Sequence, residues 1–151
     1  MTQPRNMIHE RVEAARAGAN PTVVCRVPSG WVVLGDNQLV RGYSILLCDP
    51  VVPDLNSLKP KARAQYLHDM AVVGDALLEV TDAYRINYEI ECNTVPGLHA
   101  HIFPRYMSEP EHWRKVPVWF YEKERMPVPK FDAERDKELM LRLAKAIKSR
   151  M

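Results

Sequence analysis

The stretch Leu98-His99-Ala100-His101-Ile102-Phe103-Pro104-Arg105-Tyr106 carries two histidines separated by a single residue. Its first six residues are typical of a β-strand that ends before Pro104. Successive side chains of a strand point to opposite faces, so His99 and His101 share one face, and the apolar residues between and around them face the core. A rise of about 3.3 Å per residue places the two imidazoles roughly 7 Å apart at the backbone. One phosphate group can contact both rings.

Two adjacent imidazoles suit chemistry at phosphorus. The ring titrates near pH ~6.5, so one neutral ring can attack phosphorus while a protonated neighbour stabilises the oxyanion. Asn93 lies just upstream of the pair, and Arg105 lies just downstream on the same parity. An amide and a guanidinium are suitable partners for phosphate oxygens. The pattern therefore predicts His99 and His101 as catalytic residues, with Asn93 and Arg105 as phosphate ligands.

Two other interpretations of the histidine pair remain open from the residues alone. The rings can be surface histidines on a solvated face of the sheet. They can also be two ligands of a zinc ion, which needs a third protein ligand and usually keeps a fourth position. Only folding can bring His112, Glu109 or Asp36 to such a site. No metal is predicted, and the metal site is kept as an alternative.

Around this strand, the hydrophobic periodicity alternates between the helical and the extended type. The order of elements predicts an α+β fold, with a mostly antiparallel sheet of about five strands, a long packed helix and terminal helices. Residues 107–131, rich in proline, aromatic and charged side chains, are expected to form an irregular arm on the surface. The expected helices are 2–17, 61–80 and about 132–149 with Asp132 as its cap, and the expected strands are 22–26, 31–35, 42–48, 85–92 and 98–103.

The bulk composition limits the possible partners. The chain has 151 residues, which suits one domain over residues 1–151, and its net charge is only +2. With so small a net charge, the surface as a whole has no strong positive electrostatic potential that would attract nucleic acid or an anionic membrane. No apolar run approaches the roughly 20 residues of a membrane span, and the N-terminus does not resemble a signal peptide. The widely spaced Cys25, Cys48 and Cys92 are expected to be reduced core residues of a cytoplasmic protein.

The stretch from Leu98 to Arg105 resembles the histidine triad signature, which is His-x-His-x-His followed by apolar residues and often by Pro-Arg. The resemblance implies that His99 corresponds to the middle histidine, the nucleophile of that family. It implies that His101 corresponds to the third histidine and holds the phosphate oxygens. Gly97 stands where the family has its first histidine.

The resemblance extends upstream over most of the chain. Val32-Val33-Leu34-Gly35-Asp36 is similar to a family strand that ends in an acidic residue near the ribose, which implies that Asp36 and Asn37 contact the nucleotide. Asn93 matches the family's asparagine near the phosphate, and Gly97 and Arg105 complete the implied phosphate-binding set. Only Thr94-Val95-Pro96 separates Asn93 from Gly97, whereas family members usually carry a longer Gly-Gln-Ser/Thr loop there.

The histidine triad resemblance implies a hydrolase or nucleotidyl transferase that acts through a histidine nucleophile on an α-phosphate. The implied partner is a nucleotide-like small molecule, either a dinucleoside polyphosphate or a nucleoside phosphoramidate, with no cofactor. A symmetric homodimer is also implied, with no binding to nucleic acid or membranes. The main alternative is a nucleotide-binding module without turnover, which Gly97 and the short loop favour and the His99–His101 pair disfavours. A metal-dependent hydrolase is the weaker alternative.

Overall fold

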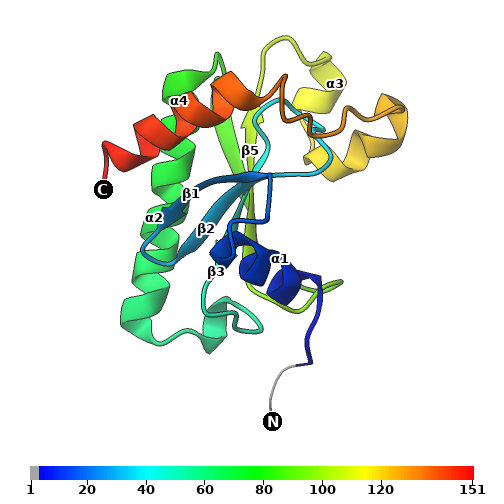
Figure 1. The fold of residues 1–151 in the computed structure, drawn as a ribbon. Coiled ribbons are helices and arrows are strands. Elements are labelled where there is room, and N and C mark those ends of the chain that lie inside the picture. Colours follow the sequence, from blue (N-terminus) through cyan, green and yellow to red (C-terminus); the bar gives the residue numbers. More distant parts are fainter. Residues whose placement is uncertain (1–3) are drawn as a thin grey trace.

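The computed structural model describes residues 4–151, which form a five-stranded antiparallel sheet covered by helices on both faces (Figure 1). The strand order is β1-β2-β3-β5-β4, so β4 forms one edge and β5 lies between β3 and β4. The predicted α+β fold with an antiparallel sheet of about five strands is confirmed. The strands are β1 (Val23–Val27), β2 (Gly30–Leu34), β3 (Ser44–Cys48), β4 (Arg85–Glu89) and β5 (His99–Arg105).

The helices divide between the two faces of the sheet. The long helix α2 and the last helix α4 pack together on one face, while α1 and the segment holding α3 and η2 lie on the other (Figure 1). The helices are α1 (Met7–Arg16), η1 (Leu55–Ser57), α2 (Pro60–Val80), α3 (Glu111–Arg114), η2 (Val118–Arg125) and α4 (Lys137–Lys148), where η marks a 3₁₀ helix.

The main core lies between the sheet and helices α2 and α4. Ala100 and Ile102 of β5 are fully buried there against a layer that includes Val73 and Leu77 of α2. Tyr66 of α2 donates its hydroxyl proton to the Leu46 carbonyl at 2.7 Å, so this buried phenol is paired. The apolar side of β5 thus faces α2 as its sequence predicts, and His99 and His101 lie on the opposite face, on the side of α1.

The ends of β4 and β5 differ from the sequence-based expectation by two or three residues, and the other strand boundaries by at most two. The strand β5 continues through Pro104 to Arg105, so the predicted stop at Pro104 is wrong. β3 pairs with β5 only as far as Ile102, and beyond that point β5 has β4 as its single neighbour. A residue without an N–H is tolerated where one side of a strand has no ladder. β4 ends at Glu89, and the chain turns away through Cys92, whose φ is +61°.

The two terminal helices start later than predicted. Residues 2 and 3 of the predicted first helix lie outside the described residues, and α1 begins at Met7 because the Asn6 side chain caps it. At the other end, Asp132 accepts bonds from the backbone N–H groups of a short preceding turn. The helix α4 begins only at Lys137, with Asp136 as its N-cap. The sequence has two aspartates four residues apart, and Asp132 was predicted as the cap although Asp136 is the N-cap of the helix.

The segment 107–131 is not an irregular surface arm, and that prediction is wrong. Its two short helices, α3 and η2, pack on the sheet face opposite α2. Val118 and Tyr121 are buried there in a second cluster with Tyr43 and Phe103. Tyr43 and Phe103 present an apolar surface on the sheet. The aromatic side chains of the 107–131 segment pack on that surface because this removes them from water.

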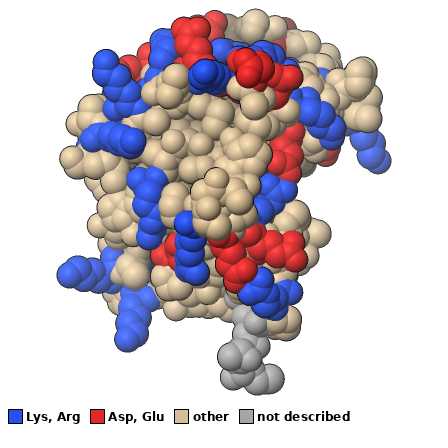
Figure 2. Space-filling model, in the orientation of Figure 1, with Lys and Arg blue, Asp and Glu red and all other residues tan. Residues whose placement is uncertain are grey.

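The surface carries charges of both signs. Figure 2 shows Lys and Arg side chains interspersed with Asp and Glu side chains on the visible face, as a net charge of +2 leads one to expect. Among residues 4–151, none of the helices combines the length and apolar character that crossing a bilayer requires.

Candidate functional site

The two histidines of β5 stand together on the sheet face that α1 covers. His99 pairs with Leu47 and His101 with Ile45 of β3, so all four side chains share one face. The ring centroids of His99 and His101 are 4.9 Å apart with an angle of 79° between the planes. Both rings line two neighbouring cavities, which we call the α1 cavity and the Asn93 cavity. The histidine pair therefore stands where these two cavities meet.

The α1 cavity has a volume of about 180 Å³ and mostly apolar walls from α1, β2 and β3. Asp36 and Asn37, at the end of β2, line it as well. The Asp36 carboxylate accepts from Arg11 of α1 at 3.2 Å, and Asn37 accepts from Lys130 at 2.5 Å. The remaining lining residues are Met7, Ile8, Val33, Tyr43, Ile45, Leu47, Val95, His99, His101 and Trp119.

The Asn93 cavity is larger, about 510 Å³, and lies on the other side of the histidine pair. Asn93 is an exposed residue of its wall. Glu91 is its one acidic side chain, and neither lysine nor arginine lines it. Phe120 of η2 also lines it, with 73% of its surface exposed, so this cavity opens towards a bare aromatic ring.

The orientation of His99 is set by a backbone carbonyl. Its Nδ1 lies 2.6 Å from the carbonyl oxygen of Gly97. A carbonyl can only accept, so Nδ1 carries the proton and, in the neutral ring, Nε2 keeps its lone pair. An unprotonated Nε2 is what a nucleophilic imidazole needs.

Gly97 has a different part in the site from the phosphate contact that was expected. It is buried beneath α1, and a Cβ at this position would lie 2.8 Å from the Cβ of Ile8. No side chain fits there without displacing α1, so a histidine has no room. What Gly97 supplies is its carbonyl, which orients His99, and it lines neither cavity.

His101 is a neutral hydrogen-bonding ring. Burial, followed by the nearby His99, lowers the pKa of His101 to about 4, which favours a neutral ring at neutral pH over the protonated partner that the sequence suggested. Its Nδ1 lies 2.5 Å from the Tyr43 hydroxyl. Burial raises the pKa of Tyr43, so the phenol keeps its proton and can donate it to Nδ1 of a neutral His101 ring. The proton of His101 then sits on Nε2, where it can donate to a phosphate oxygen.

Arg105 shares the histidine face but has its guanidinium bound elsewhere. This side chain is buried and forms an ion pair with Glu109 at 3.2 Å. It also donates to the Asn87 side chain at 2.7 Å and to the carbonyls of Trp113 and Val116 at 2.7 and 2.9 Å. Arg105 therefore fastens the 107–131 segment to the sheet, and its predicted contact with phosphate is wrong.

Tyr43 and Trp119 belong to the site but escaped the sequence reasoning. The Trp119 ring lies 5.3 Å from that of His101 at an angle of 86°, and its Nε1 donates to Glu89 of β4. Tyr43 has the parity of Ile45 in a predicted strand, so its position on the histidine face could have been found. Trp119 gave no such signal, because it lies in the aperiodic segment.

The residues named for a metal site are not brought together. Glu109 is bonded to Arg105, and Asp36 to Arg11. His112 is exposed and lies 3.3 Å from Glu124. Within the part of the chain that the structure describes, no three His, Cys, Asp or Glu side chains are placed to hold a metal ion.

No known family model and no curated protein matches this sequence, but solved structures do match the fold. A histidine triad protein from Marinobacter aquaeolei has a TM-score of 0.73 and 20% identity, covering 93% of this chain and 95% of that one. One from Bradyrhizobium japonicum has a TM-score of 0.71 and 24% identity, covering 83% and 89%. A hypothetical histidine triad nucleotide-binding protein from Sulfolobus tokodaii has a TM-score of 0.72 and 11% identity, covering 93% and 92%. At such identities the likeness concerns the fold alone.

Proposed function

We propose that this chain, which has the fold of the histidine triad proteins, cleaves nucleotide derivatives at the α-phosphorus through a covalent intermediate on His99. The observation that carries the proposal is the hydrogen-bond partner of each ring. The Gly97 carbonyl leaves a lone pair on Nε2 of His99, and when the Tyr43 hydroxyl donates to Nδ1 of His101, the proton of that ring is on Nε2. A nucleophile and an oxyanion donor thus stand side by side.

The two cavities suit the two halves of such a substrate. The nucleoside fits the apolar α1 cavity, where Asp36 and Asn37 offer acceptors for ribose hydroxyls. The phosphorus lies at the histidine pair, and Asn93 contacts its oxygens from the far wall.

Nε2 of His99 forms a bond to phosphorus, and the bond to the leaving group breaks. The leaving group departs through the Asn93 cavity with the electron pair and takes a proton from solvent. Water then attacks phosphorus and loses a proton to solvent, while the bond to His99 breaks and its electron pair returns to Nε2, which releases the nucleoside monophosphate.

The charges around the cleft favour one of the two substrate classes. A dinucleoside polyphosphate places several negative charges beyond the attacked phosphorus, and these need cationic partners. In the Asn93 cavity the charged side chain is Glu91, and in the α1 cavity Arg11 is already bonded to Asp36. We therefore infer that the natural substrate is a nucleoside phosphoramidate, whose amine leaving group carries no negative charge.

The substrate proposal is tested by comparing adenosine 5′-phosphoramidates with diadenosine polyphosphates under single-substrate kinetics. We expect kcat/KM to be at least about 10-fold higher for the phosphoramidate, since the loss of even one favourable charge contact costs about 1.4 kcal/mol or more in a partly desolvated site. Equal or better turnover of the polyphosphate would contradict the assignment of the substrate class.

A finer comparison tests Glu91 itself. Two phosphoramidates serve, one made with a diamine that keeps a free ammonium and one made with a neutral alkylamine. Glu91 is exposed, so wild type should prefer the charged amine by no more than about 5-fold. Glu91→Gln should abolish that preference, and Glu10→Gln, at an exposed position on α1, is the matched control.

A nucleotide-binding module without turnover is the second candidate. The observation in its favour is that Ile8 occupies the space of a side chain at position 97, so the chain has no counterpart of the first triad histidine. This candidate predicts that both nucleotide classes bind with micromolar affinity and that neither is hydrolysed. The same kinetic comparison therefore separates the two candidates.

We further propose a two-fold homodimer formed through the β4 edge. The strand β4 has β5 on one side and no strand of this chain on the other, among residues 4–151. Exposed Tyr88 on β4 and Leu78 on α2 add apolar surface beside that edge. Exposed edges of this type are usually covered.

Light scattering at micromolar concentration should give about twice the chain mass of 17.4 kDa. Leu78→Glu should reduce the mass to that of one chain, because it buries a charge in the proposed interface. Leu141→Glu, at an exposed position of α4, is the control and should leave the dimer intact. A wild-type chain that scatters as a monomer would refute the proposed interface.

A further inference from the structure

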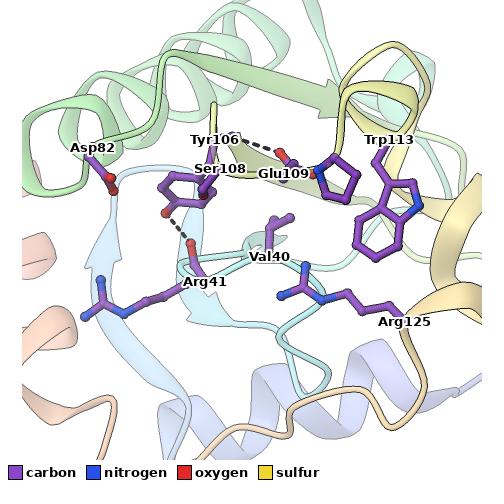
Figure 3. A pocket seen from close by; sticks show the side chains of 9 residues that line it. Val40, Arg41, Asp82, Tyr106, Ser108, Glu109, Trp113 and Arg125 are labelled. Carbon is purple, nitrogen blue, oxygen red and sulfur yellow. Dashed lines mark hydrogen bonds between the residues drawn. The ribbon is translucent and has the colours of Figure 1, made fainter.

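A third cavity, separate from the histidine cleft, lies between the 107–131 segment and the connection from β2 to β3 (Figure 3). Its volume is about 400 Å³, which is within the range of small-molecule sites. It shares no lining residue with either cavity at the histidines. The walls are Val40, Arg41, Asp82, Tyr106, Ser108, Glu109, Pro110, Trp113 and Arg125.

The aromatic walls of this third cavity are held in place by stacking and by hydrogen bonds. Trp113 stacks on Tyr121 with centroids 4.6 Å apart and planes 3° from parallel, and its Nε1 donates to Glu124 at 2.7 Å. Tyr106 donates its hydroxyl proton to the carbonyl of Arg41 at 2.5 Å. One face of the indole is thus covered by Tyr121, and the remaining indole surface lines the cavity as a fixed apolar wall.

The charged side chains that line the third cavity differ in whether they have protein partners. The Glu109 carboxylate is fully engaged, since it accepts from Arg105, from the Tyr106 backbone N–H and from the Tyr121 hydroxyl. The Arg41 and Arg125 guanidiniums form no ion pair within residues 4–151. In Figure 3 the half-buried Arg125 extends beneath Trp113 towards the middle of the cavity, while Asp82 lies on the opposite side.

We propose that this cavity is a second ligand site, which binds a small organic anion made of a flat ring and a phosphate-like group. The ring packs on Trp113 and Val40, and the anionic group is held by Arg125. A fixed indole beside a guanidinium that lacks a protein partner supplies stacking and charge-assisted hydrogen bonds in one place. The site stands independently of the chemistry proposed for His99, because the two share no residue.

Isothermal titration calorimetry with phenylphosphonate tests this second site, because the probe combines a ring and a dianion and contains no ester bond to cleave. We expect wild type to bind phenylphosphonate at least about 10-fold more tightly than inorganic phosphate, which lacks the ring. Arg125→Gln should weaken binding of phenylphosphonate by about 10-fold or more. Arg142→Gln, an exposed arginine of α4, is the matched control and should leave the affinity unchanged. Circular dichroism melting of both variants checks that they fold as wild type does.

The two cavities at the histidine pair can also bind a phosphonate, so the His99→Ala variant is titrated with phenylphosphonate in the same way. Retained affinity in His99→Ala with lost affinity in Arg125→Gln supports the second site. The reverse pattern places the probe in the cleft and overturns the proposal. Equal affinities for phosphate and phenylphosphonate overturn the role of Trp113, and no heat from wild type at millimolar probe overturns the site as a whole.

Discussion

His99→Ala abolishes turnover of an adenosine 5′-phosphoramidate, with a loss of at least about 10³-fold in kcat, while nucleotide affinity changes little. The imidazole is half-buried, and among residues 4–151 its one hydrogen-bond partner is the Gly97 carbonyl, so its removal costs little stability. Covalent attack needs the lone pair on Nε2, which alanine lacks. Steady-state kinetics and equilibrium binding of the product nucleotide measure the two effects separately.

The covalent intermediate gives this prediction its strictest test. Substrate labelled in the nucleotide part should leave label on quenched wild-type chain, in an adduct that is acid-labile like other phosphoramidates of histidine. The adduct should be absent from His99→Ala and present in His68→Ala, an exposed histidine of α2 that serves as the matched control. Undiminished hydrolysis by His99→Ala would falsify the mechanism, whatever the label shows.

His101→Ala should slow turnover by about 10²–10³-fold, because removing one oxyanion donor typically has an effect of that size. The labelled adduct on His99 should still form, only more slowly. Tyr43→Phe keeps the ring that stacks on Phe103 at 4.3 Å but removes the hydroxyl that hydrogen-bonds to Nδ1 of His101. Loss of a single neutral hydrogen bond predicts a smaller reduction for Tyr43→Phe, about 2- to 10-fold.

The order of these three effects distinguishes catalytic from positioning roles. Tyr43 acts through His101, so Tyr43→Phe should have little further effect in the His101→Ala background. Because burial lowers the pKa of His101 to about 4, its donor state does not change across the neutral pH range. A loss of rate near pH ~6.5 that disappears in His101→Ala would contradict the neutral-donor role.

The strand parity of residues 98–102 was sufficient to predict much of this fold and the position of the histidine pair. Alternation along one strand separates Ala100 and Ile102, which pack on α2, from His99 and His101, which face α1. Period-two and helical patterns then placed the neighbouring elements with small errors at their ends. Two of those errors occurred at Pro104 and Asp132, where local residue preference suggested a boundary. At Pro104 the strand continues because it pairs with β4, and at Asp132 a short turn precedes the helix.

The ionisation and the partners of the site residues were beyond the reach of the sequence. Parity placed Arg105 on the histidine face, but only the folded chain brings Glu109 and Asn87 to its guanidinium. The neutral state of His101 likewise depends on burial beneath Trp119, which comes from a segment without periodicity. Burial and long-range pairing are properties of the tertiary structure, and no spacing of residues along the chain encodes them directly.

The close contact between α1 and the strand at Gly97 also constrains how this chain can change during evolution. A histidine at position 97 meets the β-branched side chain of Ile8, which has little freedom to move within a helix. The replacement Gly97→His is therefore harmful by itself and becomes tolerable only after position 8 has become glycine, because every other residue keeps the Cβ that lies nearest. The order of the two replacements therefore matters. A chain with three triad histidines can be reached from this one only if position 8, which lies 89 positions before residue 97, changes first.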